Sequence, residues 1–113
     1  MTNTFTTLLT EKDALLADGA TGTNLFKMGL QSGDAPELWN TDEPKKIMAL
    51  YQGSVDAGSD LFLTNSFGGT AARLKLHDAQ KRVRELNRAA AELGREVADK
   101  SERKIAVAGS VGP

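Results

Sequence analysis

Three short runs of apolar residues stand out along the chain, at 14–17, 61–63 and 105–108. Apolar residues follow one another in each run, whereas a half-exposed strand would alternate apolar and polar positions. Continuous runs of this length are typical of parallel strands that are covered on both faces. The pattern therefore predicts three buried strands.

The longer stretches between these runs show helical spacing. Around 44–58, Pro44 suits a first helical position, apolar residues recur at steps of three and four, and Gly58 is a natural stop. A second long helix is predicted over 79–100, with an apolar stripe and charged residues elsewhere. The resulting order of elements is β-α-β-α-β.

The remaining segments carry weaker signals. One or two helical turns are expected around 25–28, and a short helical or irregular segment opens the chain before the first strand. A loop containing Gly29, Gly33 and Pro36 is expected to lead into the first long helix.

Alternating strands and helices predict an α/β fold, either an open doubly wound sheet or part of a closed (β/α)₈ barrel. The strands begin roughly 43 to 47 residues apart, so eight such units would need roughly 350 residues, within the range of barrels. Pro113 follows the third strand directly. We therefore expect residues 1–113 to be the incomplete N-terminal part of a single barrel.

Charge and composition narrow the class of protein. The 113 residues include 14 Lys+Arg and 15 Asp+Glu, a formal net charge of -1, which argues against nucleic acid as a partner. No run of ~18 apolar residues exists, so no membrane partner is expected. The first residues lack a basic n-region followed by an apolar stretch, which predicts a cytoplasmic protein.

Cysteine is absent and His77 is the single histidine, so this stretch offers neither a thiolate nor a disulfide. We expect His77 to be a solvated surface residue and Trp39 to be a packing residue. The charged series from Lys81 to Arg103 is expected to form the exposed face of a helix.

Each predicted strand runs into a loop of glycine and small polar residues, at 18–23, 64–69 and 109–113. Ligands bind at the carboxyl ends of the strands in both candidate layouts. In the first loop, Asp18 offers a carboxylate to an ammonium group, and the backbone N–H groups that follow suit a carboxylate or phosphate. The alternative is that Asp18 caps the next helix and the glycines serve the turn.

The second loop places Asn65 and Ser66 beside the ring of Phe67. Ligand contact and ordinary turn chemistry, with Phe67 filling the mouth of a barrel, both explain this composition. Neither a G-x-G-x-x-G fingerprint nor a G-K-[ST] phosphate loop is present, so a nucleotide-binding domain is the least favoured alternative.

Five segments together, in one order along nearly the whole chain, resemble the N-terminal part of the homocysteine S-methyltransferase family. That family includes betaine-homocysteine methyltransferases and the homocysteine-binding module of cobalamin-dependent methionine synthase. The segments that carry the resemblance are Leu15–Thr23, Ala57–Asp60, Thr64–Phe67, Glu85–Ala90 and Ala108–Pro113.

The resemblance implies a (β/α)₈ barrel and a role for each loop. Asp18 matches the acidic residue that meets the amino group of homocysteine. Gly19 and Ala20 match the loop whose N–H groups receive its carboxylate, and Thr21 extends that loop. Asn65, Ser66 and Phe67 match the loop that lines the same pocket. Gly68 stands where some betaine-using relatives carry tyrosine, which leaves the methyl donor open.

The family binds zinc through three cysteines, which are expected outside this segment, so no catalytic residue and no metal ligand is expected within it. The implied reaction is methyl transfer from betaine, a sulfonium or methylcobalamin to the homocysteine thiol, giving methionine, with cobalamin a methyl carrier in some members. The segment alone would be inactive, and it would fold poorly or associate, for example as a homo-oligomer, through uncovered surfaces. The alternative is a noncatalytic α/β module that binds an amino acid or phosphate.

Overall fold

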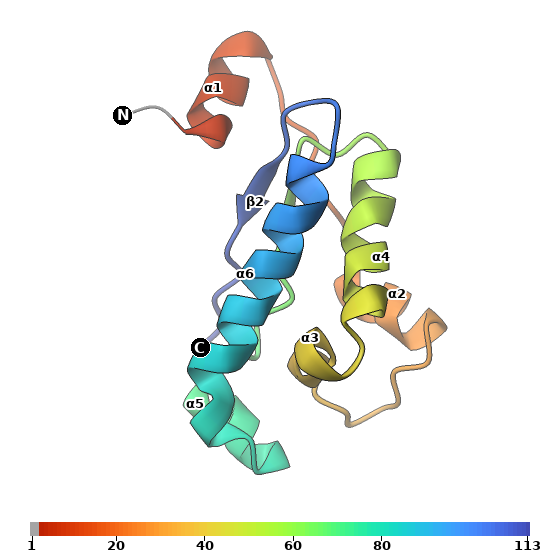
Figure 1. The fold of residues 1–113 in the computed structure, drawn as a ribbon, viewed down its shortest axis with the longest axis vertical. Helices are drawn as coiled ribbons and strands as arrows, with labels where there is room; N and C mark the ends of the chain where they lie inside the picture. The colour runs from red at the N-terminus through yellow and green to blue at the C-terminus, as the bar shows by residue number, and fades with distance from the viewer. Residues whose placement is uncertain (1–2) are drawn as a thin grey trace.

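The computed structural model describes residues 3–113, in which two long helices, α4 and α6, lie side by side against a small parallel sheet (Figure 1). Residues 1 and 2 of the N-terminal segment lie outside the described residues. The elements are α1 (Thr4–Glu11), α2 (Thr21–Lys27), α3 (Trp39–Asp42), α4 (Pro44–Asp56), β1 (Leu61–Leu63), α5 (Ala71–Leu74), α6 (Val83–Asp99) and β2 (Ala106–Ala108), with 3₁₀ turns at Pro36–Leu38, Lys75–His77 and Gln80–Arg82.

The second and third predicted strands are confirmed as a parallel pair. Strand β1 pairs with β2 in the register Leu61↔Ala106, Phe62↔Val107 and Leu63↔Ala108. On the opposite side of β1, Ala17 forms an isolated parallel bridge to Leu61. The three segments therefore lie in chain order, as successive units of a parallel sheet do.

The prediction of a buried strand at 14–17 is wrong in extent and in burial. Pairing there is limited to the bridge at Ala17, supported by the Asp60 N–H, which donates to the Leu16 carbonyl over 2.7 Å. The Leu16 side chain is 54% exposed. Among residues 3–113 only β1 pairs with this segment, so its outer edge has no neighbouring strand to extend the ladder.

Both long helices are confirmed, with one boundary corrected. Helix α4 begins at Pro44 as predicted and ends at Asp56, and Gly58 beyond it has a φ of 102°. Helix α6 begins at Val83 instead of Ala79. The Ala79 N–H donates to the Leu74 carbonyl and closes a turn, and a 3₁₀ turn follows before regular helix starts.

Short helices occupy two segments where no helix was predicted. The loop expected after Gly29 contains a 3₁₀ turn and then α3, while α5 follows Thr70. The Thr70 hydroxyl accepts from the Arg73 N–H at 3.3 Å and caps α5. One-turn helices are too short to show a recognisable apolar period, so the sequence pattern did not indicate them.

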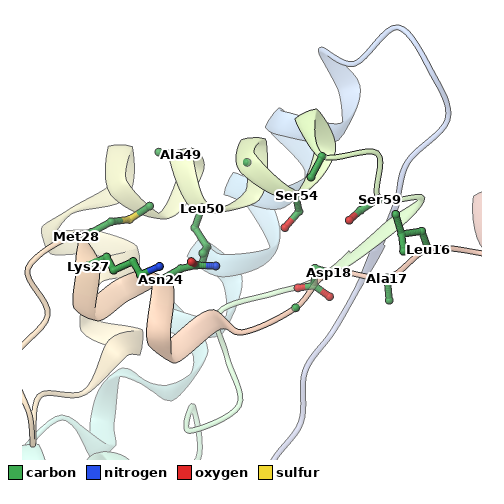
Figure 2. Close-up of a pocket in the computed structure, with 13 residues that line it drawn as sticks. Leu16, Ala17, Asp18, Asn24, Lys27, Met28, Ala49, Leu50, Ser54 and Ser59 are labelled. Carbon is green, nitrogen blue, oxygen red and sulfur yellow. The ribbon is translucent and has the colours of Figure 1, made fainter.

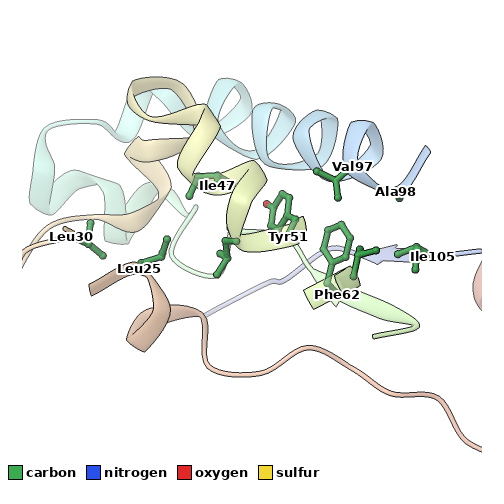
Figure 3. Close-up of a cluster of buried hydrophobic side chains, with 10 residues drawn as sticks. Leu25, Leu30, Ile47, Tyr51, Phe62, Val97, Ala98 and Ile105 are labelled. Carbon is green, nitrogen blue, oxygen red and sulfur yellow. The ribbon is translucent and has the colours of Figure 1, made fainter. Parts of the chain in front are cut away.

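The main core lies between the sheet and α4, α6 and α2 (Figure 3). At its centre the ring of Tyr51 stacks on that of Phe62, with centroids 4.7 Å apart. Trp39 packs against this core and carries the Lys46 ammonium 4.8 Å above its ring, which confirms its packing role. The buried residues of the core are Leu25, Leu30, Ile47, Leu50, Tyr51, Val55, Phe62, Val97, Ala98 and Ile105.

An ionic cluster joins the segments at the amino ends of the strands. The buried carboxylate of Asp60 accepts from Lys12 Nζ at 2.5 Å and from the Leu16 N–H at 2.8 Å. The hydrogen bond from the Leu16 N–H has the larger effect and that from Lys12 the next, and together they hold the pKa of Asp60 below its usual value. Arg103 was expected on a solvated helix face, but its guanidinium donates to the carbonyls of Val55 and Ser59 and therefore caps the end of α4.

His77 is exposed, as expected. No helix formed by residues 3–113 has the length and apolar character needed to cross a membrane.

Candidate functional site

Asp18 lies at the carboxyl end of the first strand segment, and its side chain takes part in the sheet. Its N–H donates to the Leu61 carbonyl, and its Oδ2 accepts from the Leu63 N–H, both at 3.1 Å. The carboxylate therefore accepts a hydrogen bond from β1 in the place where a backbone carbonyl of a neighbouring strand would accept it. Its Oδ1 accepts no hydrogen bond from residues 3–113, so this oxygen is available to a cationic ligand.

The alternative in which Asp18 caps α2 is wrong. The N-cap position of α2 is Ala20, which makes no side-chain hydrogen bond to the helix. Gly19 and Ala20 are exposed, and their N–H groups donate to no acceptor within residues 3–113. The loop therefore presents N–H donors next to the free oxygen of Asp18, a pairing that suits the two ends of a zwitterion. Thr21, the other predicted residue of this loop, is the first residue of α2.

A cavity of about 560 Å³ adjoins Asp18 between α2 and α4 (Figure 2). It includes Asp18 and Gly19 but none of the predicted residues of the second loop. Its other lining residues are Leu16, Ala17, Asn24, Lys27, Met28, Ala49, Leu50, Gly53, Ser54, Ala57 and Ser59. The cavity thus lies on the helix side of the strand segment, and the predicted residues do not share one pocket in this chain.

Ser66 belongs to a closed ring of hydrogen bonds that joins the ends of β1 and β2. Ser66 Oγ donates to the Ser110 carbonyl at 2.8 Å, and the Ser110 N–H donates to Thr64 Oγ1 at 3.2 Å. The two hydroxyl oxygens of Thr64 and Ser66 are 2.6 Å apart. Because the single hydroxyl proton of Ser66 is used on Ser110, Thr64 must be the donor in that contact.

Asn65 is buried and turns toward the helices. Its Nδ2 donates to the Pro36 carbonyl and to Asn40 Oδ1, and its own carbonyl accepts from Asn40 Nδ2, each at 2.9 Å. Its N–H donates to the Tyr51 hydroxyl at 2.8 Å. Burial raises the pKa of Tyr51 to about 12, so that hydroxyl remains protonated at neutral pH. Both Nδ2 hydrogens of Asn65 are used in the hydrogen bonds to Pro36 and Asn40, so neither is available to a ligand.

Phe67 stays at the end of the sheet, with its side chain 52% exposed. Gly112 approaches it so closely that a Cβ at that position would overlap the Phe67 carbonyl oxygen. The loops after β1 and β2 therefore meet beside an exposed aromatic ring. The structure brings Ser66 and Phe67 to the same end of the sheet as Asp18, while the side chain of Asn65 lies on the helix side.

Several residues that build this site were not predicted from the sequence. Tyr51 was predicted only as part of an apolar helix stripe, and Glu37 and Asn40 lie in a segment read as a loop. Thr64 lies in the second predicted loop, where the sequence pattern assigns it no particular role. The hydrogen-bond partners of these buried polar residues are distant in the chain. The local sequence around each residue therefore does not indicate that it will be buried or what it will contact.

The residues that the structure describes do not fit a zinc site. The sequence contains no cysteine. Within residues 3–113, no three His, Cys, Asp or Glu side chains come together in a way that would hold a metal ion.

The sequence has relatives among methionine synthases. Residues 15–113 match the family described as homocysteine S-methyltransferase. The chain is 32% identical over 108 residues to the methionine synthase of Mycobacterium tuberculosis and 31% identical over 108 residues to that of Mycobacterium leprae. Each alignment covers 88% of this chain but only 9% of the relative.

The solved structures that this chain resembles are also homocysteine methyltransferases. The metallated form of the homocysteine methyltransferase MmuM from Escherichia coli matches with a TM-score of 0.80 and 30% identity, over 98% of this chain and 42% of that one. The oxidised form of MmuM matches with a TM-score of 0.79 at 30% identity, over 99% and 41%. The chain thus spans less than half of the relatives it matches. It belongs to the homocysteine S-methyltransferase family.

Proposed function

We propose that the whole protein transfers a methyl group to the thiol of homocysteine, giving methionine, and that this chain binds the amino-acid end of homocysteine. One observation carries the proposal. Within the part of the chain that the structure describes, one carboxylate oxygen of Asp18 is free while the other accepts from the Leu63 N–H, and the N–H groups of Gly19 and Ala20 have no acceptor. Family membership supports the choice of homocysteine among amino acids.

The binding chemistry follows from charge. The ammonium group of homocysteine would meet Asp18 Oδ1 in a charge-assisted hydrogen bond, and its carboxylate would accept from the N–H groups of Gly19 and Ala20. The N–H of Thr21, the first residue of α2, continues this series of donors. Holding both charged ends fixes the direction in which the thiol points.

The second loop supplies the neighbouring surface. Phe67 offers an exposed apolar ring, and Ser66 and Asn65 hold the backbone that carries it. In the transfer, a sulfur–carbon bond forms to the methyl group as its bond to the donor breaks, and the thiol proton is released. We place the zinc ligands of the family outside residues 1–113, and no residue of this chain is assigned to the metal. The donor is betaine, a sulfonium or methylcobalamin.

We further propose that residues 1–113 form the first β-α-β-α-β part of a (β/α)₈ barrel in a cytoplasmic enzyme. The parallel order of the three strand segments and the TM-score of 0.80 to MmuM support the barrel. In that arrangement the exposed edge at Leu16 and the free edge of β2 would be paired by later strands.

The test is methionine formation by the whole protein from L-homocysteine with each donor class in turn: betaine, S-methylmethionine and methylcobalamin. Methionine formed from one donor and not from the others would support the function and name the donor. A folded protein that binds homocysteine by calorimetry and forms no methionine with any donor would favour the noncatalytic module. Absence of both binding and product would overturn the proposal.

A further inference from the structure

Glu37 is a buried carboxylate that the proposed binding chemistry does not use. Glu37 is 6% exposed, and its Oε2 accepts a hydrogen bond from the Gly68 N–H at 3.0 Å. Among residues 3–113 it forms no ion pair. Burying a carboxylate without a cation costs free energy, so a buried carboxylate aimed at one loop calls for a role in that loop.

The contact between Glu37 and the loop is tight. A Cβ on Gly68 would lie 3.0 Å from Glu37 Oε1 and 3.1 Å from Oε2, closer than a side chain normally tolerates. Only glycine at this position lets the N–H reach the carboxylate without displacing it. The carboxylate and the glycine therefore define one loop geometry together.

Asn40, one helical turn further along, holds the other side of the same loop. Its Nδ2 donates to the Asn65 carbonyl at 2.9 Å and to the Leu86 carbonyl at 3.0 Å, and its Oδ1 accepts from Asn65 Nδ2 at 2.9 Å. Asn40 is itself 3% exposed. Positions 65 and 68 are thus fixed from the segment before α4, and the two residues between them are Ser66 and Phe67.

We propose that Glu37 and Asn40 are positioning residues for the homocysteine site, acting through the backbone of the loop and never on the ligand itself. Glu37 fixes Gly68, Asn40 fixes Asn65, and the pair sets where the Phe67 ring stands relative to Asp18. The inference rests on the proposed function for its ligand. Preorganised loops of this kind determine affinity because no free energy is spent on ordering them at binding.

The experiment compares Glu37→Ala, Glu37→Asp and Glu37→Gln in the whole protein, with Glu43→Ala as the matched control. Glu43 is an exposed carboxylate of the same segment. The readouts are the dissociation constant for L-homocysteine by calorimetry, KM and kcat, the unfolding midpoint, and hydrogen exchange of the Gly68 amide. Glutamine keeps a side-chain oxygen acceptor at the same distance from the backbone. Aspartate keeps the negative charge but is shorter by one methylene, and alanine removes both the acceptor and the charge.

We expect Glu37→Ala and Glu37→Asp to weaken homocysteine binding about tenfold and to speed Gly68 exchange. Glu37→Gln should remain within ~3-fold of the unmodified protein, and Glu43→Ala should match it. A purely structural role would lower the unfolding midpoint and kcat with KM unchanged, and that outcome overturns the inference. Equal losses in Glu37→Asp and Glu37→Gln overturn it as well, even if Glu37→Ala does not fold.

Failure of the proposed function gives a different result. If the unmodified protein does not bind homocysteine, the proposed function is refuted. The positioning of the loop by Glu37 can still be tested by hydrogen exchange. Gly68 exchange that is fast in Glu37→Asp and slow in Glu37→Gln then supports positioning of the loop by Glu37. Equal exchange in these variants overturns it.

Discussion

The backbone N–H of Asn65 donates a 2.8 Å hydrogen bond to the hydroxyl oxygen of Tyr51, a side chain from the middle of α4. The same hydroxyl donates to the Ala90 carbonyl of α6 at 3.3 Å. One phenol therefore ties the loop after β1 to both long helices. The position of that loop depends on the helix layer as much as on the sheet.

Replacing Tyr51 with phenylalanine should destabilise the protein by about 1–3 kcal/mol, because the buried Asn65 N–H loses its acceptor. The ring itself remains and still stacks on Phe62. Urea unfolding at pH 7 measures the difference. An unchanged midpoint and slope would show that the phenol hydroxyl contributes nothing.

Alkaline pH should remove the stability that Tyr51 contributes. Its folded-state pKa of about 12 lies above the ordinary value of 10.0, mainly through burial, so the folded state holds the proton more tightly. The contribution is complete below pH 10 and is lost as pH rises through 12, about 3 kcal/mol in total. The difference in unfolding free energy between the unmodified protein and Tyr51→Phe should shrink over that interval. A constant difference would contradict the assignment.

Acid should act at the opposite end of the strands through Asp60. Its folded-state pKa is lowered by the Leu16 N–H and by Lys12, so its contribution is present above the unfolded-state pKa and disappears as pH falls through the lowered value. Asp60→Asn should therefore unfold at lower urea than the unmodified protein at pH 7. The two midpoints should converge as pH falls below about 4. Parallel curves across the acid range would exclude this role.

Asp18→Asn should weaken homocysteine binding by about 1–3 kcal/mol through loss of a charge-assisted contact. The asparagine oxygen can still accept from the Leu63 N–H, so the fold should be preserved. Calorimetry gives the affinity, and Asp13→Asn, an exposed position before the first strand segment, is the control. Equal affinities in the three proteins would remove Asp18 from the site.

Gly94 marks the closest approach of α6 to the sheet. A Cβ there would lie 2.9 Å from Val107 Cγ1 and 3.3 Å from Phe62 Cε1, so Gly94→Ala should cost about 1–3 kcal/mol by overpacking. Gly53 in α4 is the matched control, because a Cβ there meets nothing within 4 Å. Gly53→Ala should stabilise the helix by up to ~1 kcal/mol. Equal effects in a urea titration would contradict the close packing.

The sequence pattern predicted most of the frame on which the site is built. Long helices and continuous apolar strands follow from periodicity, and β1, β2, α4 and α6 all appeared close to the expected positions. The segment at 14–17 was predicted less well, because an apolar run indicates burial without saying which neighbour provides it. In residues 3–113 only one side of that segment is paired.

The contacts of the site were much harder to predict. Glu37, Asn40 and Tyr51 each act on a loop whose residues are distant in the chain, so no spacing rule indicates the partnership. Asp18 is predicted from the sequence as a ligand contact, and that prediction gave no sign that its carboxylate accepts from the Leu63 N–H, because this bond depends on strand register. Register is a property of the assembled sheet and has no signature in the local sequence.

The parallel pairing of β1 with β2, and of Ala17 with Leu61, also bears on how the chain folds. In each pair a whole helical segment lies between the two partners, so a sheet contact closes a long loop. Helices form from local contacts within about a microsecond, whereas such closures are slow. We therefore expect the docking of α4 and α6 to help bring the strands into register. Sequence changes in the helix interface are then expected to alter the rate at which the sheet assembles, even where no strand residue is changed.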